Sequence, residues 1–194
     1  MAGTNHRRDI VVVGASLGGV QALRQLVKTM PADFAASVFL VLHRGAHSTS
    51  FLPQVLRGRS GHAIVEPIDQ QPIARGRIYL APRDVHMTIE DGHVRILRGP
   101  KEHFTRPAVD PLFRSAAAAY GARVVGVVLT GGGHDGLSGL IAIKAAGGLA
   151  LVQQPTEAQS PSMPVHAIVR DNPDAVMPLD EIGTTLARLM NGGG

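Results

Sequence analysis

The stretch Ile10-Val11-Val12-Val13-Gly14-Ala15-Ser16-Leu17-Gly18-Gly19 decides the fold class of this chain. Four β-branched residues in a row are typical of a strand that is covered on both faces of its sheet. The run then breaks into glycines around one serine, and apolar residues recur with helical spacing from Val20. A serine on so tight a strand-to-helix turn has two uses: its hydroxyl is a nucleophile, or the turn holds an anion at the helix N-terminus.

The composition is that of one globular domain with a sizeable core. Of the 194 residues, 44% are hydrophobic and 18% are charged, which is not the balance of a disordered chain. There is no cysteine, so disulfides, thiolate metal sites, iron–sulfur clusters and a cysteine nucleophile are excluded. Neither a signal peptide nor an apolar run of membrane-spanning length is present, which predicts a cytoplasmic protein without membrane insertion.

The net charge of +4 favours acidic partners in general. Nucleic acid is not expected among them, because only 4% of the residues are aromatic, there is no tryptophan, and the basic residues are scattered. An acidic protein surface fits the same charge.

Strand and helix patterns alternate along the chain. Strands are predicted at 10–13, 37–42, 63–65, 77–81, 124–129 and 149–152, and helices at 20–30, 48–56, 110–120, 137–143, 163–169 and 180–190. Residues 87–96 are expected to form a hairpin closed by Asp91-Gly92. We therefore predict a doubly wound α/β fold, with a mainly parallel sheet, helices on both faces and a small β-hairpin.

Three polar residues each come directly after a predicted strand. Ser16, His43 and Asp135 should therefore lie at the C-terminal edge of the sheet, where α/β proteins bind ligands. Gly14 to Gly18 match the G-x-S-x-G pattern of a nucleophile, and a serine nucleophile needs a base. Of nine histidines, only His43 and His134 follow strands at this edge, and His43 is preferred because it ends its strand directly.

Asp135 is the acidic residue at the same edge, suited to orient the imidazole and stabilise its charged form. Its alternative role is to cap the helix that follows. Glycines beside it, Gly132 and Gly133, offer backbone N–H groups for an oxyanion hole, as does Leu17. The loop from Arg98 to Val109 is expected to cover the site, which makes Lys101 and Arg106 substrate-contact candidates.

Two other site types stay open at this point. A dinucleotide site would require an acidic residue after the second strand, where this chain has His43-Arg44. Arg44 suits a 2′-phosphate, so an NADP-dependent reductase is an alternative. A metal site is not expected, because Gly45 separates His43 from His47 and no carboxylate completes a ligand set.

With these residues assembled, the chain resembles the catalytic domain of CheB, the chemotaxis protein-glutamate methylesterase. The resemblance extends from Ile10 to about Leu189. It rests on the serine turn, the strand ending at His43, and five further blocks: Tyr79-Leu80-Ala81-Pro82, His86-Met87, Arg106 to Ala117, Leu129 to Gly136, and Met163-Pro164.

The resemblance implies hydrolysis of glutamyl methyl esters on the cytoplasmic helices of chemoreceptors, with deamidation of receptor glutamines as a related activity. It also implies Ser16, His43 and Asp135 as the catalytic triad, with no metal and no cofactor. A catalytically weak docking module of a chemosensory pathway is the alternative function.

Several positions depart from the family pattern. Leu17 stands where threonine is usual, Arg44-Gly45 where Met-Pro is usual, and Gly132 where methionine is usual. The expected domain organisation is a flexible tail at residues 1–9, the catalytic domain at 10–190 and a glycine tail at 191–194. No receiver domain is expected in this chain, so two alternatives stay open: constitutive activity, or regulation by a separate protein.

Overall fold

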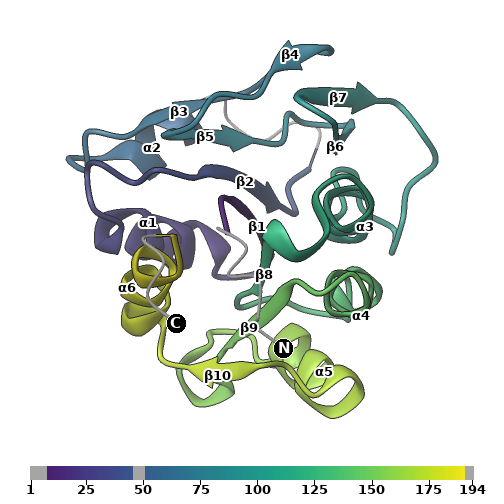
Figure 1. Ribbon diagram of the computed structural model, residues 1–194. Coiled ribbons are helices and arrows are strands. Elements are labelled where there is room, and N and C mark those ends of the chain that lie inside the picture. Colours follow the sequence, from purple (N-terminus) through teal and green to yellow (C-terminus); the bar gives the residue numbers. More distant parts are fainter. Residues whose placement is uncertain (1–7, 46–50, 191–194) are drawn as a thin grey trace, which may run out of the picture.

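A seven-stranded sheet runs through the computed structural model, which describes residues 8–45 and 51–190 (Figure 1). In chain order its strands are β1 (Ile10–Ala15), β2 (Ser37–Leu42), β3 (Ala63–Val65), β5 (Arg77–Leu80), β8 (Val124–Val128), β9 (Leu149–Gln153) and β10 (Ala175–Met177). Every pairing in this sheet is parallel, and the strand order is β10-β9-β8-β1-β2-β5-β3. The strands β2, β5 and β3 lie on one side of β1, and the later strands β8, β9 and β10 lie on the other. The strand order therefore reverses at β1, and the topological switch point of the sheet lies at the end of β1.

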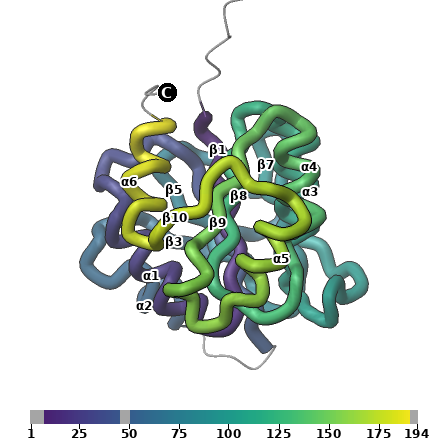
Figure 2. The backbone as a smooth tube through the Cα atoms, turned by 90° about the horizontal axis from the view of Figure 1, so that it is seen from below, coloured from purple at the N-terminus to yellow at the C-terminus, as the bar shows by residue number. Residues whose placement is uncertain are grey.

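Helices cover both faces of this sheet (Figures 1 and 2). One face carries α1 (Gly19–Thr29), α2 (Leu52–Arg57) and α6 (Leu179–Met190), and the other carries α3 (Val109–Tyr120), α4 (Leu137–Ala145) and α5 (Ser162–Asp171). Val11 and Val13 enter the first core, whereas Val12 enters the second. Because both faces are covered, β1 has no polar alternation, and the predicted doubly wound α/β fold is confirmed.

A small antiparallel sheet lies on the α3 side. It contains the predicted hairpin, formed by β6 (His86–Glu90) and β7 (His93–Leu97) around Asp91-Gly92, and a third strand, β4 (Gln71–Pro72). The pattern did not predict β4 because the strand has only two residues and one of them is proline. β10 and the short 3-10 helices η1 (Gly121–Arg123) and η2 (Pro155–Glu157) were also not predicted.

The predicted boundaries need two comments. Asp9, which the sequence assigned to a flexible tail, is only 4% exposed, because Arg75 and Arg123 donate to its carboxylate at 2.6 and 2.8 Å. The packed domain therefore begins before β1, and the rest of both predicted tails, 1–7 and 191–194, lies outside the described residues. Ser48, where a helix was expected to begin, also lies outside them, and α2 begins at Leu52.

Within residues 8–45 and 51–190, none of the helices combines the length and the apolar character needed to cross a membrane.

The closest helix packing on the α3 side depends on a glycine. A Cβ placed on Gly139 of α4 would collide with the side chain of Phe113 in α3. Both residues are buried. The two helices can therefore approach each other only while residue 139 has no side chain.

We predict that Gly139→Ala lowers the free energy of unfolding by about 1–3 kcal/mol through overpacking. Alanine is intrinsically the better helix former by about 1 kcal/mol, so without the collision the same substitution would raise the free energy of unfolding. The sign of the change therefore distinguishes overpacking from helix propensity. Urea denaturation measures the change. The matched variant Ser138→Ala, on the exposed side of the same turn, should stay within about 0.5 kcal/mol of the parent. A stabilised Gly139→Ala protein would contradict this account of the packing.

Candidate active site

The serine turn connects β1 to α1 at the switch point of the sheet. The Ser16 N–H donates to the Thr130 carbonyl at 2.9 Å, and the Ser16 carbonyl accepts the Gly19 N–H at 2.8 Å. Gly18, with φ of 79°, takes the left-handed conformation that begins the helix. These bonds tie the serine to the loop after β8 as well as to its own helix.

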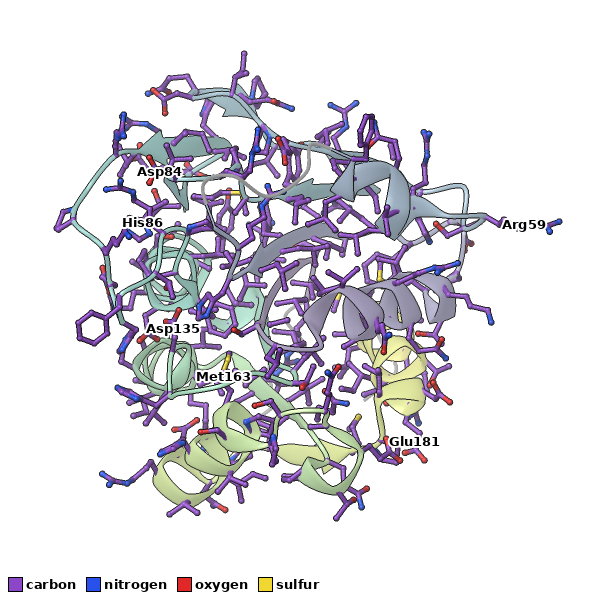
Figure 3. All side chains as sticks on the ribbon, turned by 180° about the vertical axis from the view of Figure 1, so that it is seen from behind. Arg59, Asp84, His86, Asp135, Met163 and Glu181 are labelled. Carbon is purple, nitrogen blue, oxygen red and sulfur yellow. The ribbon has the colours of Figure 1, made fainter. Side chains whose placement is uncertain are left out.

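Gly131 allows the loop after β8 to approach the serine. A Cβ at Gly131 would lie 2.8 Å from the Cβ of Ser16 and would overlap the sulfur of Met163. Figure 3 shows Met163 beside α4, close to Asp135. Of the glycines in the Leu129 to Gly136 block, Gly131 is therefore the one that permits close packing against Ser16.

His43 follows β2 directly and extends its pairing with β1, because the His43 N–H donates to the Ala15 carbonyl at 3.0 Å. Its ring lies between two partners. Nδ1 is 3.1 Å from Ser16 Oγ, and Nε2 is 2.6 Å from Asp135 Oδ2. The structure thus brings the three predicted residues together in one series of hydrogen bonds.

Asp135 is buried and accepts three hydrogen bonds from two segments, the end of β2 and the start of α3. Besides His43, the N–H groups of Val109 and Asp110 donate to its two oxygens at 2.6 and 2.9 Å. Burial alone would raise the pKa of this carboxyl, but the hydrogen bonds from His43 and the two backbone groups outweigh burial and hold the pKa below its usual value. Asp135 is therefore ionised at neutral pH.

The alternative role expected for Asp135, a cap on the helix after it, is wrong in detail. α4 begins after Gly136 with no side-chain cap at that position, whereas Asp135 bonds the first N–H groups of α3. Asp110 of α3 in turn accepts the Gly139 N–H of α4 at 2.7 Å. Each helix N-terminus is thus satisfied by a carboxylate next to the other helix.

The ionised carboxylate sets the tautomer of His43. Because Asp135 can only accept, Nε2 of His43 carries the proton and donates it to Asp135. Nδ1 is then the free base and accepts the hydroxyl proton of Ser16. This orientation is the reverse of the serine protease template, in which Nε2 faces the serine and Nδ1 faces the aspartate.

His103 is a neighbour of the site that the sequence did not assign to it. Its Nε2 lies 2.8 Å from Asp110 Oδ2 and 3.8 Å from Asp135 Oδ1. It sits in a tight turn in which Glu102 and Thr105 exchange backbone hydrogen bonds, with φ of 49° at His103 and 62° at Phe104. Glycine or asparagine usually occupies such positions, so the residue types did not predict this turn.

His103, Asp110 and Asp135 are also the one group in the described residues with ligand atoms close enough together to hold a metal ion. Their polar atoms already have other partners. Both oxygens of Asp135 and Oδ1 of Asp110 accept N–H groups, and His103 donates toward Asp110. Hydrogen bonds therefore satisfy this cluster without a cation. His47 of the rejected metal pair lies outside the described residues.

A cavity of about 530 Å³ opens beside the serine. Its apolar lining includes Leu17, which is 61% exposed, together with Val20, Leu42 and Leu52. Leu17, which stands where threonine is usual in the family pattern, thus forms part of the apolar wall next to Ser16.

The oxyanion candidates keep their backbone donors available. In the described part of the chain, no acceptor takes the N–H of Leu17, Gly132 or Gly133, whereas the N–H of Gly131 donates to the Ser160 carbonyl. These three N–H groups stay our prediction for the oxyanion hole.

The basic residues near the site differ in their availability. The Arg44 side chain is 5% exposed, bonds Glu66 and the Ala81 carbonyl, and lines the cavity beside Ser16. The Arg106 guanidinium bonds Asp84 and the Gly99 carbonyl and so braces the loop that was expected to cover the site. Lys101 is exposed on that loop and stays a predicted substrate contact.

A buried histidine holds the base of the same loop. His86 donates from Nε2 to the Pro100 carbonyl at 2.8 Å and accepts the Ala108 N–H on Nδ1 at 3.3 Å. Figure 3 shows His86 and Asp84 on the side of α3 that faces the small sheet. The loop is therefore fixed at both ends before it reaches His103.

Fold and site together define a class of protein. It is an α/β domain with a serine, a histidine and an aspartate hydrogen-bonded in series at the switch point of a parallel sheet. The family model described as CheB methylesterase matches residues 11–186. The chain belongs to the CheB methylesterase family.

Individual relatives agree with this assignment. A protein-glutamate methylesterase/protein-glutamine glutaminase from Paramagnetospirillum magneticum is 39% identical over 186 residues, which cover 93% of this chain and 49% of that protein. A relative from Leptospira interrogans is 35% identical over 182 residues, covering 93% of this chain and 94% of that protein. The crystal structure of the Thermotoga maritima CheB methylesterase catalytic domain matches with a TM-score of 0.88 at 30% identity, covering 93% of this chain and 98% of that one. The chain thus spans about half of the Paramagnetospirillum protein and nearly all of the Leptospira protein.

We predict that Asp135→Asn lowers the free energy of unfolding by about 1–3 kcal/mol at pH 7, because the two backbone N–H groups lose their charged acceptor. The pKa of Asp135 is lower in the folded protein, so its contribution is present above about pH 4 and is lost as the pH falls below that value. The difference in the free energy of unfolding between parent and variant should therefore shrink as the pH falls below about 4.

Urea denaturation at a series of pH values measures this difference, with Ser16→Ala as the matched variant. Ser16→Ala removes a hydroxyl without leaving a buried N–H unpaired and should change stability by about 0.5 kcal/mol or less. An Asp135→Asn protein as stable as Ser16→Ala would contradict the capping role of Asp135.

Proposed function

We propose that this chain hydrolyses the γ-methyl esters of glutamate side chains on the cytoplasmic helices of chemoreceptors. The observation that carries the proposal is the series of hydrogen bonds from Ser16 Oγ through His43 to Asp135. Membership of the CheB methylesterase family supports the substrate class. Receptor glutamine deamidation is a related activity, in keeping with the full name of the Paramagnetospirillum relative.

The first half of the reaction forms an acyl-enzyme. Ser16 Oγ attacks the ester carbonyl carbon while Nδ1 of His43 takes the hydroxyl proton. The negative charge that develops on the carbonyl oxygen is stabilised by backbone N–H groups from Leu17, Gly132 and Gly133. The C–O bond to the methoxy group then breaks, and His43 returns the proton to the departing oxygen, which releases methanol.

The second half regenerates the enzyme. A water molecule attacks the acyl carbon while Nδ1 of His43 takes one of its protons. The bond to Ser16 Oγ breaks, the proton passes from His43 to the serine oxygen, and the glutamate side chain leaves as a carboxylic acid, which releases its own proton to solvent. Asp135 stays ionised and stabilises the imidazolium of His43 at each step, which suits its lowered pKa.

The cavity beside the serine suits this substrate. Its apolar wall, formed in part by Leu17, Leu42 and Leu52, offers a surface to the methylene stem and methyl group of a glutamyl ester. The reactive end needs only the nucleophile, the base and the oxyanion donors.

We predict that Ser16→Ala reduces methanol release from a methylated receptor fragment by about 10³-fold or more, because the acyl-enzyme no longer forms. A serine-directed phosphonate should label the parent once and this variant not at all, which is read by mass spectrometry. Ser138→Ala, which removes a surface hydroxyl, should keep both properties.

Undiminished activity in Ser16→Ala would overturn the assignment of the nucleophile. A parent protein that binds the methylated fragment but neither releases methanol nor takes the label would instead identify a docking module without esterase activity.

A further inference from the structure

A second cavity adjoins the one at the serine. It has a volume of about 920 Å³ and lies between α1 and the end of α2, and Gln21 lines both cavities. Its walls carry four exposed cations, Arg24 and Lys28 from α1 and Arg57 and Arg59 from the end of α2 and the turn after it. We call this feature, with Gln21 at its mouth, the basic groove.

The four cations lack counter-ions. Within residues 8–45 and 51–190, none of them lies within ion-pair distance of a carboxylate, and Asp180 bonds the neutral Gln25 of the groove wall. Seven arginines elsewhere have carboxylate partners, whereas Arg77, Arg170 and Arg188 have none among the described residues; the paired ones are Arg44, Arg75, Arg95, Arg98, Arg106, Arg114 and Arg123. The basic groove thus gathers four cations without a carboxylate partner in one place.

This arrangement has a cost in the free protein. Arg24 and Lys28 are four residues apart on α1 and so share a helix face, where like charges repel. The position of a Cβ on Gly58 would be 3.9 Å from Nε of Arg24, so Arg24 also lies next to the segment between Arg57 and Arg59. Figure 3 shows Arg59 extending away from the molecule at this end. Repulsion of this kind is relieved when an anionic partner occupies the groove.

We propose that the basic groove docks an acidic stretch of the substrate helix while the cavity at Ser16 holds the reacting ester. This inference rests on the proposed function and names the part of the substrate that gives affinity. Nucleic acid is disfavoured as the occupant, because no aromatic side chain among the described residues lines the groove and offers a stacking surface. Continuity with the cavity at Ser16 through Gln21 favours a polypeptide that occupies both.

The geometry also sets the spacing in the substrate. From the start of α1 at Gly19 to Lys28 is nine residues, or about 13 Å along the helix axis. An α-helical substrate covers that distance in two to three turns. Acidic side chains two to three turns from the methylated glutamate, on the same face, should therefore meet the groove.

Two synthetic helical peptides test the proposal. Each carries one γ-methyl glutamate, and one peptide has glutamates two to three turns away where the other has glutamines. The parent should hydrolyse the acidic peptide with a kcat/KM about tenfold higher at low salt, mostly through KM, and the preference should vanish near 0.5 M salt, where the Debye length is about 4 Å.

A variant with Arg24, Lys28, Arg57 and Arg59 all changed to glutamine should lose this preference. It should still hydrolyse a tetrapeptide ester that is too short to reach the groove, which shows that the fold and the triad are intact. The matched control changes Arg170, an exposed arginine on α5, to glutamine and should keep the preference. The double variant Arg24→Lys with Lys28→Arg, which keeps both charges, should also keep the preference.

An unchanged preference in the four-site variant would overturn the proposal. If that variant at the same time lost binding of RNA or of anionic lipid vesicles, the occupant of the groove would be one of these instead of an acidic peptide. If the parent hydrolyses no ester at all, the proposed function fails separately, and fluorescence anisotropy of the two peptides with the Ser16→Ala protein still decides the groove: tighter binding of the acidic peptide supports docking, and equal binding refutes it.

Discussion

Three N–H groups from two separate parts of the chain converge on the carboxylate of Asp135, and the rest of the site depends on this convergence. Two of them begin α3, and the third belongs to His43 at the end of β2. Burial of the carboxylate is tolerated only because these donors are present. The same contacts that orient the imidazole therefore also join α3 to the sheet edge, so stability and preorganisation of the site have a common source.

The parallel sheet explains why these groups meet at all. β1, β2 and β8 are neighbours, and all of them end at the same edge. Each of the three catalytic candidates lies in the segment after one strand: Ser16 follows β1, His43 follows β2 and Asp135 follows β8. Gly131 then lets the loop after β8 come within contact of the serine. The chemistry is thus a product of strand order together with a few positions where no side chain is tolerated.

Strand ends were enough to place Ser16, His43 and Asp135 at one edge, because the β-branched runs are long and end abruptly. Other features depend on tertiary contacts that no local pattern encodes. Asp135 stands before α4 and yet caps α3, since the two helix N-termini lie side by side. His103 reaches the site through a turn that its residue types disfavour. The basic groove is assembled from two helices and so was not visible as a run of charge.

The ring of His43 faces the serine with Nδ1 and the aspartate with Nε2, and this orientation determines which ring nitrogen a chemical probe would modify. Nδ1 lies nearer the main chain than Nε2 does, so the contact with the serine depends directly on where the backbone places residue 43. A methyl group on Nδ1 would separate the ring from the serine, and one on Nε2 would separate it from Asp135. An alkylating substrate analogue held at the serine would accordingly leave its mark on Nδ1, whereas the serine protease arrangement would be marked on Nε2.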